Sequence, residues 1–142
     1  MSKVLIVTGS RTLHDLEHLH RHLEALRHAL VNETTTDFAE LWHGGARGVD
    51  AIAVVYARLC NLPARAWPAD WSLGRHAGLI RSTRMIDAAP PDSVIAAFTD
   101  KPLCKSRGTA FTVARARGLR VYLVEDYKAG RWLDQQPSLF AR

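Results

Sequence analysis

The stretch KVLIVTGS, residues 3–10, predicts how this chain folds. Apolar and β-branched residues run without interruption from Val4 to Thr8 and stop at Gly9 and Ser10. A parallel strand that is covered on both faces has this pattern, because neither face needs polar side chains. We therefore expect residues 3–8 to form a buried strand that ends in a tight turn.

The same pattern, a strand followed by a helix, repeats along the rest of the chain. Leucines recur at helical spacing from Leu13 to Leu30, and Thr12 with Asp15 resembles a capping box before them. Further strands are expected at residues 38–42, 63–69, 92–98 and 119–125, and further helices at 49–60, 76–88 and 108–117. Such alternation predicts an α/β fold, a doubly wound parallel sheet of about five strands with right-handed crossovers and helices on both faces.

The length and composition of the chain are those of one globular domain, with 142 residues of which 47% are hydrophobic. The opening apolar run is too short for a signal peptide, and no stretch approaches the roughly 18 apolar residues of a membrane span. We therefore expect a cytoplasmic protein that does not contact a membrane. The alternating pattern ends near residue 126, so we expect residues 1–126 to form the domain and residues 127–142 to form a tail docked on it or on a dimer mate.

The charge of the chain favours an anionic partner. Nineteen lysines and arginines against 14 acidic residues give a formal net charge of +5, and most of the basic residues are arginine, which suits phosphate recognition. In doubly wound sheets, ligands bind beyond the carboxyl ends of the strands, where the strand order reverses. The loops after the first, second and fourth expected strands carry GSR, GGARG and KSRGT. Because backbone amides in glycine turns attract anions, we expect a phosphorylated ligand at this edge.

Four motifs follow one another along the chain. They are TGSR (8–11), HGGARGVD (43–50), PADW with the following G, AG, IR and RM (68–85), and SRGT with the following alanines, glycine and valine (106–121). Their order resembles the YspA/YpsA-like branch of the SLOG superfamily over residues 4–124. Related members include the LONELY GUY phosphoribohydrolases and the DNA-processing protein A family. The resemblance implies a Rossmann-like domain that binds a nucleotide or a nucleotide-derived ligand, such as ADP-ribose, an NAD relative or a cyclic nucleotide, often as a homodimer.

The resemblance also implies which residues bind the ligand. By position they are Gly9, Ser10, Arg11, Gly44, Gly45, Arg47, Gly48, Asp50, Arg81, Arg107, Gly108 and Thr109. Arg47 is expected to be the charge contact of the second loop, and Asp50 is expected to support the start of a helix. Trp71, an aromatic residue expected to be exposed near this edge, completes the set.

Departures from the phosphoribohydrolase pattern favour binding without turnover, as a sensor or a sequestering module. The segment RSTRM keeps Arg81 and Met85 of that pattern, but Thr112 stands where the catalytic glutamate should be. A carboxylate that could stabilise an oxocarbenium-like transition state is therefore missing at that position. Asp50, Asp70 or Asp100 could supply one from another loop, so an N-glycosidase acting on nucleoside monophosphates, with Arg81 as its catalytic residue, stays as the alternative.

Single-stranded DNA binding is a second alternative, because the second loop also resembles the SGLARGID element of DNA-processing protein A. Non-specific binders of single strands combine a basic groove with aromatic rings on which bases stack. Trp42 and Trp67 fall in expected strands and are assigned to the core, which leaves Trp71 as the exposed ring.

No metal ion or organic cofactor is expected. His14, His18 and His22 recur every four residues, a spacing that can chelate a metal, but a stripe on the polar face of a helix is more often solvated surface. Cys60 and Cys104 lie far apart without a neighbouring cluster of cysteine and histidine, so both are expected to be free thiols.

The C-terminal residues suggest one more partner. Gln136, Leu139 and Phe140 resemble the short peptides that dock on bacterial sliding clamps, although Pro137 stands where those peptides usually have leucine. Apolar residues near a chain end more often pack on their own domain or on a dimer mate, so both interpretations stay open.

Overall fold

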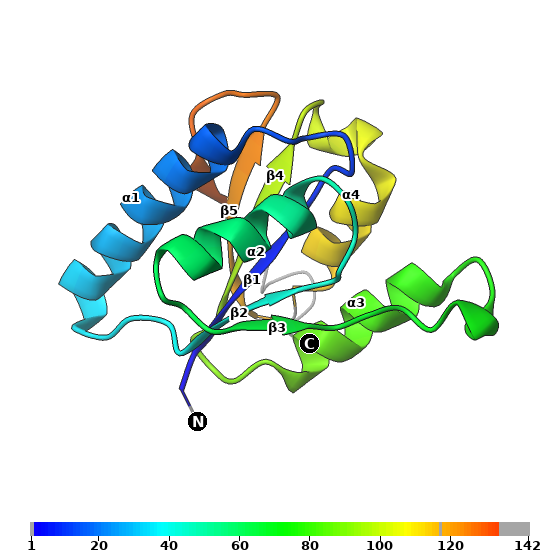
Figure 1. Ribbon diagram of the computed structural model, residues 1–142, viewed down its shortest axis with the longest axis horizontal. Helices are drawn as coiled ribbons and strands as arrows, with labels where there is room; N and C mark the ends of the chain where they lie inside the picture. Colours follow the sequence, from blue (N-terminus) through cyan, green and yellow to red (C-terminus); the bar gives the residue numbers. More distant parts are fainter. Residues whose placement is uncertain (1, 117, 134–142) are drawn as a thin grey trace.

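The structure is a computed structural model that describes residues 2–116 and 118–133. Its central sheet is flanked by helices on both faces (Figure 1). The strands are β1 (Val4–Gly9), β2 (Glu40–His43), β3 (Ala64–Ala66), β4 (Val94–Thr99), β5 (Arg120–Glu125) and β6 (Arg131–Leu133). The α-helices are α1 (Leu16–Thr34), α2 (Val49–Leu59), α3 (Ala77–Ala88) and α4 (Arg107–Ala114), and two short 3-10 turns, η1 (Trp71–Leu73) and η2 (Leu103–Lys105), precede α3 and α4.

The strand order is β3-β2-β1-β4-β5-β6, and all neighbouring pairs except the last are parallel. β1 lies at the centre, with Leu5 beside both Leu41 of β2 and Val94 of β4. This arrangement confirms the predicted α/β class and the Rossmann-like doubly wound sheet. The sixth strand was not predicted, because three residues are too few to show a period; it pairs antiparallel with β5.

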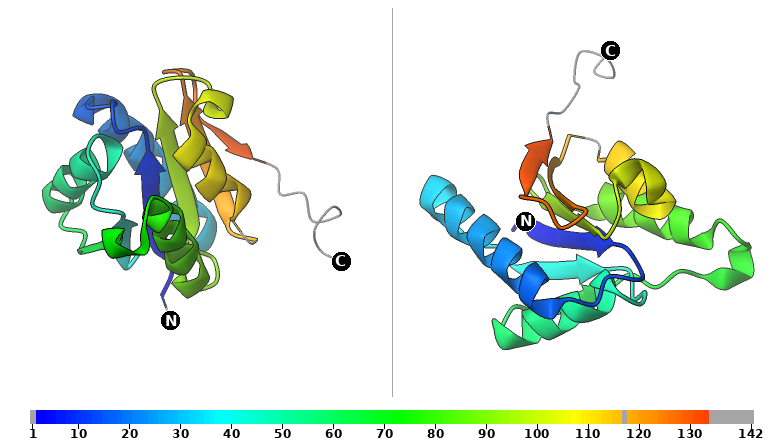
Figure 2. Two further views of the ribbon diagram at one scale, coloured as in Figure 1. Left: turned by 90° about the vertical axis from the view of Figure 1, so that its right-hand side faces the viewer. Right: turned by 90° about the horizontal axis from the view of Figure 1, so that it is seen from above.

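Alternate residues of β1 point into two different hydrophobic cores. Leu5 and Val7 are buried with the leucines of α1 and with α2, whereas Val4 and Ile6 are buried with Met85 and Ile86 of α3. The two views in Figure 2 show helices on both sides of the sheet. Because both faces are covered, β1 needs the unbroken apolar run from which it was predicted. None of the helices in the described ranges has the length and apolar character needed to cross a membrane.

The beginning of α1 differs from its prediction. The helix begins at Leu16, and its N-cap is Asp15, whose carboxylate accepts a hydrogen bond of 3.0 Å from the amide of His18. Thr12 does not take part in a capping box. Its hydroxyl donates instead to Asp100, which follows β4. The residue that was expected to cap a helix therefore connects two loops at the carboxyl edge of the sheet.

The expectation that the histidine stripe is solvated surface is wrong for His18. Its side chain is buried, and its ring lies 4.9 Å from the ring of Tyr127 and 6.0 Å from that of Phe98. Burial lowers the pKa values of both His18 and His22. These two rings therefore contribute to packing between α1 and the sheet.

The residues proposed as a sliding-clamp peptide, Gln136, Leu139 and Phe140, lie outside the described residues, as does most of the expected tail.

Two leucines of similar chemistry but opposite burial test this core. Leu19 of α1 is fully buried, whereas Leu59 at the end of α2 is 63% exposed. We expect Leu19→Ala to lower the free energy of unfolding by about 2–5 kcal/mol, because it leaves a cavity between α1 and β1. Leu59→Ala should change it by less than about 0.5 kcal/mol. Urea unfolding followed by circular dichroism measures both values, and equal losses would contradict this assignment of the core.

Candidate functional site

A cleft of about 410 Å³ opens at the carboxyl edge of the sheet. The chain proceeds from β1 through β2 to β3 on one side and returns through β4 and β5 on the other, so the strand order reverses between β1 and β4. This is the position at which doubly wound sheets bind their ligands. The cleft, called the main cleft below, is lined by the first loop (residues 9–12, at the end of β1), by α3, by the loop after β4 and by the start of α4.

The structure brings most of the predicted ligand residues to this edge. Those that line the main cleft are Gly9, Ser10, Arg11, Asp50, Trp71, Arg81, Arg107, Gly108 and Thr109. A neighbouring cleft of about 440 Å³ is lined by Gly44, Gly45 and Arg47 and shares Arg11, Trp71 and Arg81 with the first. Gly48 lines neither of the two. It turns the chain at a positive φ of 72°, directly against the backbone of Ser10 and Arg11.

Three amides of the second loop, residues 44–48 after β2, bond to the protein itself. The amides of Gly44 and Ala46 donate to Oδ2 of Asp50 at 2.9 and 3.2 Å, and the amide of Gly45 donates to Nδ1 of His43 at 3.0 Å. These three donors were expected to surround a phosphate. Because these hydrogen bonds are made within the protein, the three amides are already bonded and do not surround a phosphate. The remaining predicted charge contact of this loop is the side chain of Arg47, which lines the neighbouring cleft.

Asp50 does more than support the start of α2. Its side chain is buried, and burial raises the pKa of this carboxyl; the amides of Ala46 and Gly44 and the charge of Arg81 act in the opposite direction. A buried carboxylate is stabilised when it accepts hydrogen bonds, and here two amides of one loop supply them. Asp50 thus fixes the shape of the second loop.

Burial also lowers the pKa of His43. Since Nδ1 of this ring accepts a hydrogen bond from Gly45, the neutral form carries its proton on Nε2. His43 and Asp50 hold the same loop from its two ends.

Arg81 extends from α3 to the ends of β2 and β3. Its Nη1 donates to the carbonyl oxygens of Gly44 and Trp67 at 2.5 and 3.2 Å, and its Nε donates to the hydroxyl of Ser82 at 3.3 Å. Its Nη2 donates to no atom of the described residues, and the side chain lines both clefts. Arg81 therefore stabilises the second loop and still offers a donor to a ligand.

The start of α4 is the other distinctive part of the main cleft. No side chain caps this helix, and Ser106, Arg107, Gly108 and Thr109 all line the cleft. The first amides of a helix have no partner within it, and they attract anions. The hydroxyl of Thr112, at the position of the missing glutamate, donates back to the carbonyl oxygen of Gly108 at 3.1 Å. The hydroxyl of Thr112 is thus bonded to the backbone of its own helix.

Sequence reasoning missed several charged residues of the cleft. Arg75, Lys101 and Lys105 line it as well, so that six cationic side chains surround the space: Arg11, Arg75, Arg81, Lys101, Lys105 and Arg107. Lys101 and Lys105 stand in a loop that was identified as basic, but no motif connects them to a ligand. Their position in the loop after β4, at the carboxyl edge of the sheet, was the one signal that could have placed them in the cleft.

Asp100 brings a carboxylate to the same cleft. Its Oδ2 accepts the hydroxyl hydrogen bond of Thr12, and its backbone amide donates to the hydroxyl of Ser10 at 3.3 Å. The hydrogen bond from Thr12 lowers the pKa of this carboxyl. Its other oxygen, Oδ1, is inaccessible to solvent and has no hydrogen-bond partner among the described residues.

Replacing Asp50 tests its role in the second loop. Asp50→Ala leaves the amides of Gly44 and Ala46 without an acceptor, and we expect each to cost about 1–3 kcal/mol in the free energy of unfolding. Asp50→Asn keeps one acceptor oxygen and should lose less. Asp87→Ala, which removes an exposed carboxylate from α3, is the control and should unfold like the wild type in urea. A loss for Asp50→Ala no larger than that for Asp87→Ala would contradict this role.

Comparison with known proteins supplies independent information on the first half of the chain. Residues 3–74, from β1 through η1, match the model of the YspA, cpYpsA-related SLOG family. No match was found among curated proteins or among solved structures. The matched segment spans half of the chain and contains both the first loop and the second loop, which confirms the resemblance that the motifs predicted. The chain therefore belongs to the YspA, cpYpsA-related SLOG family.

Proposed function

We propose that this protein binds a phosphorylated, nucleotide-derived small molecule in the main cleft and acts as a sensor or a sequestering module. Membership of the SLOG family suggests a ligand related to nucleotides. One observation carries the proposal: six cationic side chains and the uncapped start of α4 surround the same space of about 410 Å³. A cleft of this size accommodates a small molecule. ADP-ribose, relatives of NAD and cyclic nucleotides are the ligand classes we favour.

The phosphates of such a ligand fit best between the first loop and α4. The dipole of α4 favours negative charge at its first turn, and Arg107 and Lys105 add positive charges beside it. Arg11 faces the same space from the first loop. The second loop has already used the amides of residues 44–46, so it contributes side chains rather than a backbone cradle.

The base of the ligand has one clear candidate contact. Trp71 lies in η1, is 59% exposed and lines both clefts. An exposed indole offers a large apolar face, which suits stacking on a purine or a nicotinamide. Asp70 caps this turn by accepting hydrogen bonds from the amide and the hydroxyl of Ser72, so the position of Trp71 is supported locally.

Binding can be measured with the purified chain and a panel of mononucleotides, NAD, ADP-ribose and cyclic nucleotides. We expect at least one of them to raise the melting temperature and to give a saturable titration. Arg107→Ala removes a charge-assisted hydrogen bond to phosphate, worth about 1.5–3 kcal/mol, and should weaken binding roughly tenfold to a hundredfold. Arg21→Ala, which removes an exposed arginine from α1, is the matched control and should bind like the wild type.

Adding single-stranded oligonucleotides to this panel distinguishes the proposal from DNA binding. Absence of binding to every small molecule, together with retention of single-stranded oligonucleotides, would contradict the proposal and favour the DNA alternative.

Asp100 gives the N-glycosidase alternative a specific basis. Asp100 lines the cleft, and its lowered pKa keeps the carboxyl ionised at neutral pH. An ionised carboxylate can stabilise an oxocarbenium-like transition state, but it cannot donate a proton to the leaving base. Thr112 stands in place of the expected glutamate, and the other carboxyl that lines the cleft, that of Asp50, accepts hydrogen bonds from the amides of Gly44 and Ala46.

We therefore expect no free base to be released from any nucleoside monophosphate, as followed by liquid chromatography. Release by the wild type that disappears in both Asp100→Asn and Arg81→Ala would establish the glycosidase instead. Asp87→Ala serves as the control for any change caused by removing a carboxylate elsewhere.

A further inference from the structure

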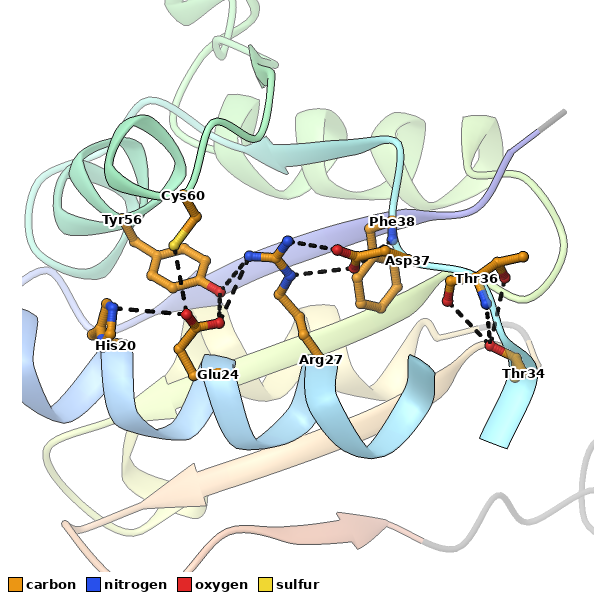
Figure 3. A network of polar contacts seen from close by, with 9 residues as sticks. All are labelled: His20, Glu24, Arg27, Thr34, Thr36, Asp37, Phe38, Tyr56 and Cys60. Carbon is orange, nitrogen blue, oxygen red and sulfur yellow. Dashed lines mark hydrogen bonds and ion pairs between the residues drawn. The ribbon is translucent and has the colours of Figure 1, made fainter. Parts of the chain in front are cut away.

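Three different metal-binding side chains meet where α1 packs on α2, in a cluster that shares no residue with either ligand cleft. His20 and Glu24 are one helical turn apart on α1, and Cys60 is the residue that ends α2. Figure 3 shows the imidazole, the carboxylate and the thiol directed toward one another. The sequence separates Cys60 from Glu24 by 36 residues, so only the fold brings them together.

The distances between the ligand atoms are slightly longer than those of an occupied metal site. Oε1 of Glu24 lies 3.9 Å from Nε2 of His20 and 3.8 Å from Sγ of Cys60, and the three ligand atoms all lie within 4.8 Å of one another. In a tetrahedral zinc site, with metal–ligand distances of about 2.0–2.3 Å, neighbouring ligand atoms are roughly 3.5 Å apart. A side-chain movement of less than about 1 Å would therefore bring this cluster to that geometry.

We propose that His20, Glu24 and Cys60 form a binding site for a zinc-class divalent cation. Imidazole and thiolate are ligands that zinc and cobalt accept readily, whereas magnesium and calcium prefer oxygen. The side chains of His20 and Glu24 are 44% and 46% exposed, so solvent can fill the fourth position. When the ion binds, the thiol proton of Cys60 leaves to solvent and the thiolate forms the bond to the metal.

A chain of hydrogen bonds orients the carboxylate of this site. The hydroxyl of Tyr56 donates to Oε2 of Glu24 at 3.1 Å, which leaves Oε1 directed toward His20 and Cys60. Nη1 of Arg27 in turn donates to the Tyr56 oxygen at 2.8 Å. Groups that hydrogen-bond to a metal ligand, as Tyr56 does to Glu24, fix the orientation of that ligand.

Arg27 is a positive charge close to the site, with its Nη1 3.8 Å from Oε2 of Glu24, and Asp37 balances it. Its Nε and Nη2 donate to the two carboxylate oxygens of Asp37 at 3.2 and 2.6 Å, forming a bidentate pair (Figure 3). The side chain of Arg27 is only 13% exposed. Because Asp37 compensates this charge, Arg27 can hold Tyr56 in place without repelling a cation strongly.

This site differs from the one that the histidine stripe suggested. His14, His18 and His22 share a helical spacing, but His18 is buried against Phe98, so its ring is not available as a surface ligand. His20 lies on another side of the helix, toward α2, with its ring 5.5 Å from that of Tyr56.

Cobalt(II) gives a direct readout of the proposed site. The purified full-length chain, without an affinity tag and stripped with a chelator, is titrated with Co²⁺ alone. We expect the near-ultraviolet charge-transfer band of a cobalt–thiolate bond and the visible bands of tetrahedral cobalt, all lost when Zn²⁺ is added. Cys60→Ser should abolish the charge-transfer band. His20→Ala and Glu24→Gln should weaken binding at least tenfold, and Tyr56→Phe should weaken it roughly tenfold to a hundredfold through its effect on Glu24.

Two controls use the same residue types elsewhere. Cys104→Ser removes the other cysteine, and His14→Ala removes an exposed histidine that precedes α1; both should keep the wild-type spectrum. The proposal is overturned if the wild type shows no band at a tenfold molar excess of Co²⁺, if Cys60→Ser keeps the band, or if Cys104→Ser loses it. Circular dichroism checks that each variant is folded, and Glu24→Gln, which replaces a half-exposed side chain, provides the test if Cys60→Ser is not.

Discussion

The close approach of the first two loops at the end of β1 is the constraint on which the edge of this sheet depends. A Cβ atom on Gly9 would lie 2.6 Å from the side chain of Val49 and still closer to the carbonyl oxygen of Phe98. A Cβ atom on Gly48 would lie 2.6 Å from the Cα of Arg11. The amide of Val49 donates to the carbonyl oxygen of Ser10 at 3.1 Å, which joins the start of α2 to the first loop. Glycine is therefore required at both positions for β1, β4 and α2 to meet.

Because of this contact, the three glycine loops have different roles. The second loop passes so close to the first that its own shape must be fixed, and Asp50, His43 and Arg81 fix it with hydrogen bonds. Gly44 and Gly48 serve packing, since a Cβ atom on Gly44 would meet the Arg81 guanidinium, whereas Gly45 has open space and a positive φ of 73°. The start of α4 is not committed in this way. Glycine loops that look alike in sequence thus take different roles: the amides of residues 44–46 are bonded within the protein, whereas Ser106, Arg107 and Gly108 at the start of α4 line the cleft.

The predictable part of this structure is the part that local patterns encode. β1 has an unbroken apolar run because both of its faces are covered, and α1 has a strong helical period because its buried face is long; glycine turns mark the ends of β1 and β2. The N-cap at Asp15 and the bond from Thr12 to Asp100 were not predictable, because either residue has the chemistry of a cap and only the position of β4 decides between them. The partners of Asp50 depend on how sharply the chain turns at residues 44–48. Cys60 joins His20 and Glu24 only through the packing of two helices.

The helix dipoles are consistent with the charges assigned to the two sites. The uncapped first turn of α4, with its partial positive charge, lies at the cleft where cationic side chains gather, so an anion there is stabilised by both. The cysteine of the proposed metal site ends α2, where the partial charge is negative and a cation is favoured. α2 also begins at the second loop, which Asp50 in its first turn holds in place. One short helix thus connects the proposed anion cleft with the proposed cation site, and Asp50 at its start and the partial negative charge at its end suit these two proposals.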